Sequence, residues 1–229
     1  MIIKYMYFTL MGIVFLIVLG LSVTITTEVV KRRTREQIFS DIFGESKDYM
    51  LTQDTVEEAH YNRYGVFLDD DMASFIVECC ESFDVDPNLV VAILEKENPL
   101  LVKDAVSKPN ENGTVDTGLF QLNDRSLYSK GGFLDKYWNE SLGEFNSSNW
   151  KNNAYVAIRL IGDLENMFGK GKVYWIACAY NAGPQRTYRE WTKDIGDSNI
   201  YLPESTRNSY APAVVQNFKK WNEITGSLK

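Results

Sequence analysis

The clearest alternation of apolar and polar residues lies between residues 86 and 98, where it repeats with the period of an α-helix. Four residues spaced three or four positions apart share one face there: Val90, Ile93, Leu94 and Glu97. Asp86 is a favourable N-cap, and Pro87 suits the first helical position because the N–H that it lacks has no helical partner there. We therefore predict a helix over residues 86–98 whose buried face ends at Glu97.

The same period predicts three further helices, at residues 71–83, 150–169 and 173–180. Apolar stripes mark the first two: Met72, Phe75, Ile76, Cys79 and Phe83, then Tyr155, Ile158, Ile161, Leu164 and Phe168. The second ends in a glycine, which readily adopts the backbone conformations that terminate helices. The third is too short to cross a bilayer, and we expect its Tyr174 and Trp175 to lie in the core.

Turn-forming residues follow the helix predicted at residues 86–98. An Asn-Gly pair at residues 112–113 favours a tight turn with positive φ, and residues 114–117 have the composition of a strand. The sequence therefore predicts a mainly α (α+β) domain, a helical bundle-like fold with a small β-hairpin or ordered loop. The hairpin would bring Asp116 and Gln121 near the end of the helix that carries Glu97.

The N-terminal region has a different pattern, because residues 5–25 are almost wholly apolar and carry no charge. A helix over this run would span roughly 30 Å, the thickness of a bilayer core. We predict an uncleaved transmembrane anchor at residues 1–30, a stalk or linker at 31–68 and the main domain at 69–229. A cleaved signal peptide is the alternative.

Composition limits the functions that are open to the chain. With 229 residues and 45% hydrophobic content, it can bury one substantial core. A net charge of −7 disfavours nucleic-acid binding, which normally uses a basic surface. Cys79, Cys80 and Cys178 lack the spacing of a metal site, so we expect buried free thiols and predict no metal or cofactor. His60 is the single histidine, and we discount a histidine-dependent catalytic triad.

Glu97 is the candidate catalytic group of the helix at residues 86–98. A carboxyl group held against apolar walls loses hydration in its charged form, so its pKa rises toward the range in which a general acid works. The alternative is a helix-terminal glutamate that contributes only a surface charge. Glu95 lies off the apolar face, and we expect it to be solvated.

Four motifs occur in an order and spacing typical of one enzyme family. They are AILEKEN at residues 92–98, NGTVDTGLFQLN at 112–123, AYNAGP at 179–184, and LPESTR at 202–207 followed by Tyr210. Together they resemble the catalytic domain of lytic transglycosylases of the soluble-lytic-transglycosylase type, within the lysozyme-like superfamily. The resemblance implies a lysozyme-like fold for the main domain.

The resemblance also implies roles for residues at matching positions. Glu97 matches the catalytic acid/base of the family. The residues that match substrate-binding positions are Gly118, Gln121, Tyr180, Asn181 and Tyr210. Two departures stand out: Asn98 replaces the usual serine after the catalytic glutamate, and one extra residue precedes Tyr210. The first departure leaves the polar partner of Glu97 open.

Three functions are compatible with these residues. A peptidoglycan lytic transglycosylase would cleave the β-1,4 bond between N-acetylmuramic acid and N-acetylglucosamine with Glu97 alone and leave a 1,6-anhydro product. A lysozyme-type hydrolase would use Asp116 as a second carboxylate. Asp116 is equally compatible with capping N–H groups of the hairpin. The third possibility is that the chain is a non-catalytic, membrane-tethered protein that binds glycan or takes part in assembly.

The resemblance implies a location that conflicts with one feature of the sequence. Action on peptidoglycan glycan strands implies a single-pass membrane protein with an extracytoplasmic domain on the periplasmic or cell-wall side. The basic cluster at residues 31–35 would instead favour a cytoplasmic domain, although long folded domains are exported despite flanking charge. A phage virion protein or a secreted protein is the alternative, with envelope-spanning or phage assembly partners.

Overall fold

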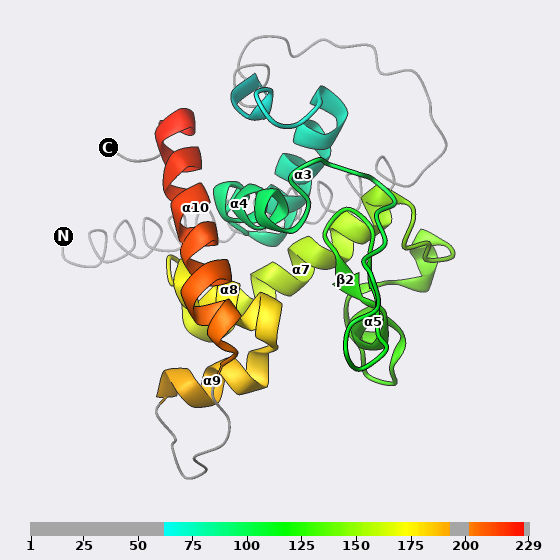
Figure 1. The fold of residues 1–229 in the computed structure, drawn as a ribbon. Coiled ribbons are helices and arrows are strands. Elements are labelled where there is room, and N and C mark those ends of the chain that lie inside the picture. Colours follow the sequence, from blue (N-terminus) through cyan, green and yellow to red (C-terminus); the bar gives the residue numbers. More distant parts are fainter. Residues whose placement is uncertain (1–61, 193–201, 227–229) are drawn as a thin grey trace, which may run out of the picture. The chain divides into compact units, whose positions relative to one another are not determined.

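The computed structural model describes residues 62–192 and 202–226 (Figure 1). The predicted anchor at residues 1–30, most of the stalk, and His60 lie outside the described residues. Among the helices that are described, none combines the length and apolar character needed to cross a membrane. Residues 62–68, which the sequence places in the stalk, include the buried side chains of Tyr64 and Leu68.

The described residues form helices joined by loops, with one two-stranded antiparallel sheet, as predicted. The helical elements are η1 (Asn62–Tyr64), α3 (Asp70–Phe83), α4 (Pro87–Glu97), α5 (Asp124–Tyr128), α6 (Phe133–Tyr137), η2 (Glu140–Leu142), α7 (Trp150–Phe168), α8 (Val173–Ala182), α9 (Pro184–Thr192), η3 (Thr206–Tyr210) and α10 (Ala211–Thr225). The strands are β1 (Asp116–Thr117) and β2 (Leu122–Asn123). Asp116 pairs with Asn123, so residues 118–121 form the turn of the hairpin.

Helix α4 begins and ends as the sequence predicts. The Asp86 carboxylate accepts the N–H of Asn88, and Pro87 is the first helical residue. Burial extends further around the helix than the predicted stripe, because every residue from 88 to 94 is buried. Helix α4 is therefore a central helix of the domain rather than a surface helix with one apolar face.

Helices α3 and α7 pack against each other beside α4. Helix α3 begins at an Asp69 N-cap, and α7 ends at Gly169, whose φ is +95°. All three cysteines are free and buried, which confirms that prediction. The predicted stripe of α7 is also buried. The spacing of apolar residues therefore located these two helices correctly.

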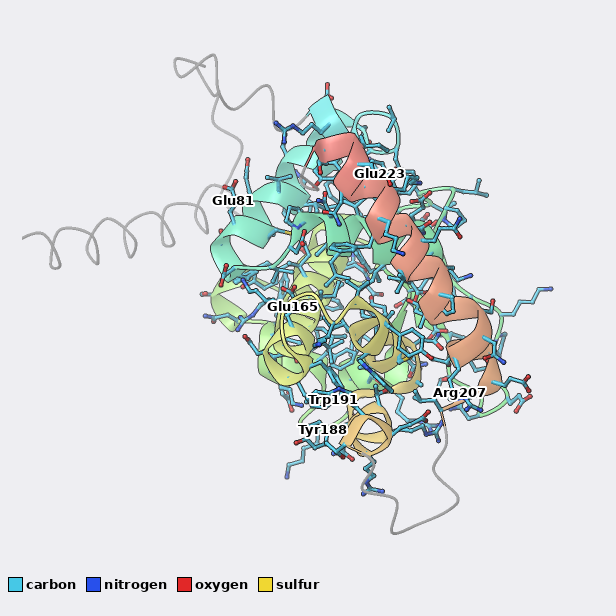
Figure 2. The ribbon with its side chains drawn as sticks, turned by 90° about the vertical axis from the view of Figure 1, so that its left-hand side faces the viewer. Glu81, Glu165, Tyr188, Trp191, Arg207 and Glu223 are labelled. Atoms are coloured by element: carbon cyan, nitrogen blue, oxygen red, sulfur yellow. The ribbon has the colours of Figure 1, made fainter. Side chains whose placement is uncertain are left out.

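Helix α10 packs against α4 and α8 (Figure 1). Arg207 and Glu223, labelled in Figure 2, lie near its two ends. The buried Asn88 amide donates to the side chains of Asn222, at 2.8 Å, and Thr225, at 3.1 Å. These contacts fix the start of α4 to the end of α10, although the two segments are far apart in the sequence.

Two predictions for individual side chains are wrong. Glu95 is not simply solvated, because it accepts the indole N–H of Trp221 at 2.9 Å and pairs with Lys220, both on α10. Tyr174 and Trp175 are half-buried rather than core residues, and they line a cavity of about 580 Å³ between α8 and α10. In both cases α10 supplies the neighbours, and the local pattern carries no information about it.

Candidate active site

A cavity of about 560 Å³ lies at the C-terminal end of α4. The hairpin and the end of α8 form two of its walls. The predicted site residues among its lining are Glu97, Asp116, Gln121, Tyr180 and Asn181. The fold therefore brings together residues that are more than 80 positions apart in the sequence. Gly118 and Tyr210, the other two predicted residues, lie behind these walls.

Glu97 is half-buried at the end of α4, with its carboxyl group at the cavity. The hydroxyl group of Tyr210 donates a hydrogen bond to Oε1 of Glu97. Burial raises the pKa of Glu97 to about 7, while the Tyr210 hydrogen bond lowers it, the charge of Asp116 raises it and that of Lys96 lowers it. Because burial is the largest effect, Glu97 is poised to hold a proton near neutral pH.

Tyr210 reaches Glu97 from η3, which is a π-helical turn. In such a turn the backbone bonds run from residue i to i+5, and the N–H of Ala211 donates to the carbonyl of Thr206. A π turn therefore accommodates one more residue than an α-helical turn. It lies where the family resemblance implies one extra residue before Tyr210.

The turn at residues 118–121 is held from behind by Asn153, a fully buried residue of α7. The Asn153 amide accepts the N–H of Phe120 at 2.7 Å and donates to the carbonyl of Thr117 at 2.9 Å. Gly118 has a φ of +76°, and a Cβ atom there would lie 2.3 Å from Nδ2 of Asn153. Glycine is therefore required at this position by the backbone conformation and by the close approach of Asn153.

Gln121 and Tyr180 line the cavity and also hold this turn. The Gln121 amide donates to the carbonyl of Gly118 at 2.8 Å, and Gln121 itself adopts a φ of +50°. The Tyr180 hydroxyl donates to the carbonyl of Phe120 at 2.9 Å. Tyr180 thus contacts the hairpin backbone, and Tyr210 is the tyrosine that contacts Glu97.

Asn98, at the position where the family resemblance implies a serine, is buried. Its Nδ2 donates to the carbonyls of Val102, at 2.8 Å, and Leu119, at 3.1 Å. Its Oδ1 accepts the N–H of Val102 at 3.0 Å. Asn98 therefore joins the end of α4 to the hairpin turn, and the polar partner left open by the sequence is Tyr210.

Asp116 lies on the hairpin wall of the cavity and is half-buried. Its two carboxylate oxygens accept hydrogen bonds from the amides of Asn123, at 2.8 Å, and Asn110, at 3.3 Å. Its backbone N–H donates to the Ser107 hydroxyl at 2.9 Å. The carboxylate is therefore held in place by amide donors at the cavity surface.

Several lining residues were not predicted. Amide and hydroxyl groups extend the hairpin wall, namely those of Asn110, Asn112, Thr114, Asn123 and Ser126. Apolar side chains complete the lining: Leu122, Phe133, Leu160, Ala179, Ala182 and Pro184. The density of asparagines around the hairpin is a signal for these groups in the sequence, although asparagine is also typical of turns. Phe133 stands on a helix of five residues, which is too short for a periodic pattern.

Within the described ranges, no three histidine, cysteine or acidic side chains cluster closely enough to bind a metal ion. The cavity instead offers a protonatable carboxyl group, a second carboxylate and several amide groups. Such groups form hydrogen bonds with sugar hydroxyls and with amide substituents.

Comparisons with known proteins place the chain in a family. The sequence model of the transglycosylase SLT domain matches residues 75–202, more than half of the chain. No curated protein shows a significant match. A solved structure of an inactive mutant of lytic transglycosylase Slt from Pseudomonas aeruginosa matches with a TM-score of 0.49 and 18% identity, over 68% of this chain and 24% of that chain. The family match includes every predicted site residue except Tyr210, and the chain belongs to the transglycosylase SLT domain family.

Proposed function

We propose that the chain is a peptidoglycan lytic transglycosylase in which Glu97 acts first as general acid and then as general base. The observation that carries the proposal is the position of Glu97 at the cavity, where burial raises its pKa to about 7. A group with this pKa exchanges a proton readily at neutral pH, as both steps require. Membership of the SLT family supports the substrate class, because the family name describes transglycosylase domains.

The first step breaks the glycosidic bond. Glu97 donates its proton to the glycosidic oxygen, and the N-acetyl carbonyl oxygen of N-acetylmuramic acid bonds to C1 as the leaving sugar departs. In the second step, the Glu97 carboxylate takes the proton of the C6 hydroxyl group. The C6 oxygen then bonds to C1, which displaces the acetamido oxygen and closes the 1,6-anhydro ring. The hydrogen bond from Tyr210 stabilises the Glu97 carboxylate between the two steps.

A lysozyme-type hydrolase is the second candidate, because Asp116 lines the same cavity as Glu97. In that reaction the Asp116 carboxylate would stabilise or attack C1, and water would be the final acceptor. The two amide hydrogen bonds hold the Asp116 carboxylate at the cavity wall in either case. The products of the two reactions differ by one water molecule, so the candidates are separable by mass.

The proposal includes the location of the domain. The N-terminal apolar run would anchor the chain in a membrane, with the catalytic domain on the extracytoplasmic side, where peptidoglycan lies. Its partners would be glycan strands and the membrane. Labelling of single cysteines introduced into a cysteine-free version of the chain, with reagents that cannot cross the membrane, tests this orientation.

The experiment that tests the reaction is mass spectrometry of the soluble products released from purified peptidoglycan by the full chain. Products with anhydro ends, lighter than the hydrolytic ones by the mass of one water, support the transglycosylase. Reducing ends would support hydrolysis with Asp116 instead. Glu97→Gln should release products about 10³-fold more slowly. The matched control Glu81→Gln changes an exposed residue of α3, labelled in Figure 2, and should behave as wild type. No product from the wild-type chain would contradict both reactions.

A further inference from the structure

We infer that Thr206 is a positioning residue that orients the amide of Asn181 so that its NH₂ group faces the cavity and binds a carbonyl oxygen of the glycan. The likeness of the cavity to a glycan site comes from the proposed function, on which the choice of ligand rests. The orientation of the amide comes from contacts among residues of η3 and α8.

Thr206 acts from behind the cavity wall. It is 1% exposed, and its hydroxyl group donates to Oδ1 of Asn181 at 2.6 Å. Asn181, in contrast, is exposed and lines the cavity. The contact therefore joins a buried hydroxyl group to the one side of the Asn181 amide that accepts hydrogen bonds.

The chemical consequence follows from the donors and acceptors of an amide. Its oxygen only accepts hydrogen bonds and its nitrogen only donates them. The oxygen has two lone pairs, and the buried Thr206 hydroxyl group holds one of them from behind the cavity wall. With the oxygen held on that side, we place the NH₂ group of Asn181 toward the cavity. A donor of this kind pairs with the carbonyl oxygen of an N-acetyl group and cannot pair with the ammonium group of a de-N-acetylated sugar, which also only donates.

The π-helical turn gives this contact its place in the site. Thr206 and Tyr210 are the first and last residues of η3, four positions apart and on one side of the helix. Thr206 contacts Asn181 on α8, and Tyr210 contacts Glu97 on α4. One turn therefore holds both the proposed carbonyl-binding amide and the proposed catalytic acid.

Binding of oligosaccharides to the full chain carrying Glu97→Gln, which prevents turnover, tests the inference. The ligands are N-acetylglucosamine oligomers and their de-N-acetylated counterparts at mildly acidic pH, measured by calorimetry. Thr206→Val should weaken binding of the acetylated oligomer about tenfold, the value of one hydrogen bond, and Thr206→Ser should restore it. Asn208→Ala, an exposed change in the same turn, should leave binding unchanged.

Asn181→Asp provides a test that does not depend on a buried substitution. The aspartate still accepts the Thr206 hydroxyl group but presents an oxygen to the cavity in place of the NH₂ group. The preference should then shift from acetylated toward de-N-acetylated oligomers. Thr206→Val should also add no further loss to Asn181→Ala, because the two changes remove the same interaction.

Three results would overturn the inference: unchanged binding by Thr206→Val, additive losses in the double variant, or an unchanged preference in Asn181→Asp. If the wild-type chain cleaves peptidoglycan but any of these is observed, the inference alone fails. If the expected binding pattern appears but the wild-type chain cleaves nothing, the proposed reaction alone fails. The two conclusions are therefore tested separately.

Discussion

Glu97 and Glu165 are glutamates in similar chemical surroundings but in different positions. Burial is the largest cause of the raised pKa of each. Glu97 lines the cavity and accepts a hydrogen bond from the hydroxyl group of Tyr210. Glu165 lies on α7, is 3% exposed and accepts the backbone N–H of Asp86 at 3.4 Å (Figure 2).

The difference shows what burial alone does not provide. Around Glu165, the backbone hydrogen bond from Asp86 and the charge of Lys170 oppose the effect of burial, whereas the carboxylates of Asp86 and Asp84 add to it. Glu97 has a comparable balance of charges, but its carboxyl group also lies at a cavity, where a ligand can accept its proton. A raised pKa therefore identifies a buried carboxyl group, and access to a cavity identifies the candidate acid.

The largest predicted effect separates the two glutamates by activity. Glu97→Gln should lower the rate of peptidoglycan cleavage by about 10³-fold, within the range for loss of a general acid. Glu165→Gln should leave the rate within about twofold of wild type, because it changes no group at the cavity. Release of soluble glycan fragments measures both. A wild-type rate for Glu97→Gln would remove Glu97 from the mechanism.

The second prediction concerns pH. The first step requires protonated Glu97, whose pKa burial raises to about 7. Above that pH the protonated fraction falls, so the rate should fall by about tenfold per pH unit. Initial rates over a pH series measure this limb. A rate that stays constant well above pH 7 would show that another group supplies the proton.

Removal of the Tyr210 hydroxyl group should have a smaller effect. Its hydrogen bond lowers the pKa of Glu97, so Tyr210→Phe should move the alkaline limb to higher pH. The maximum rate should fall by about tenfold, because the carboxylate formed in the first step loses one stabilising donor. Tyr180→Phe is the matched control: its hydroxyl group contacts the Phe120 carbonyl, so the limb should stay in place. Movement of the limb in both variants would contradict the assignment.

The smallest prediction concerns stability. Because folding raises the pKa of Glu165, the contribution of this residue to stability is fully present below the pKa that it has in the unfolded chain. It is lost as the pH rises through the folded pKa. Glutamine resembles the protonated form, so Glu165→Gln should raise the free energy of unfolding at alkaline pH by about 1 kcal/mol. The variant should then unfold at a higher urea concentration than wild type. Equal stabilisation at pH 4 and pH 8 would contradict this cause.

The sequence predicted the parts of the site that depend on local pattern. The period and caps of α4 placed Glu97 at the end of a buried helix, and turn-forming residues indicated the hairpin. Contacts made by α10 and η3 were not predictable in this way. Tyr210 meets Glu97 across 113 positions, and Trp221 meets Glu95 across 126, so neither contact leaves a local periodic signal.

The π-helical turn also affects how this chain is compared with others. A residue inserted into an ordinary α-helix rotates everything beyond it by about 100°, which would turn the buried face of α10 away from α4. The family resemblance implies one extra residue before Tyr210, and the wider turn would accommodate it while α10 keeps its packing against α4. If the family motif were placed on residues 206–210 without a gap, its tyrosine would therefore fall on Ser209 instead of Tyr210.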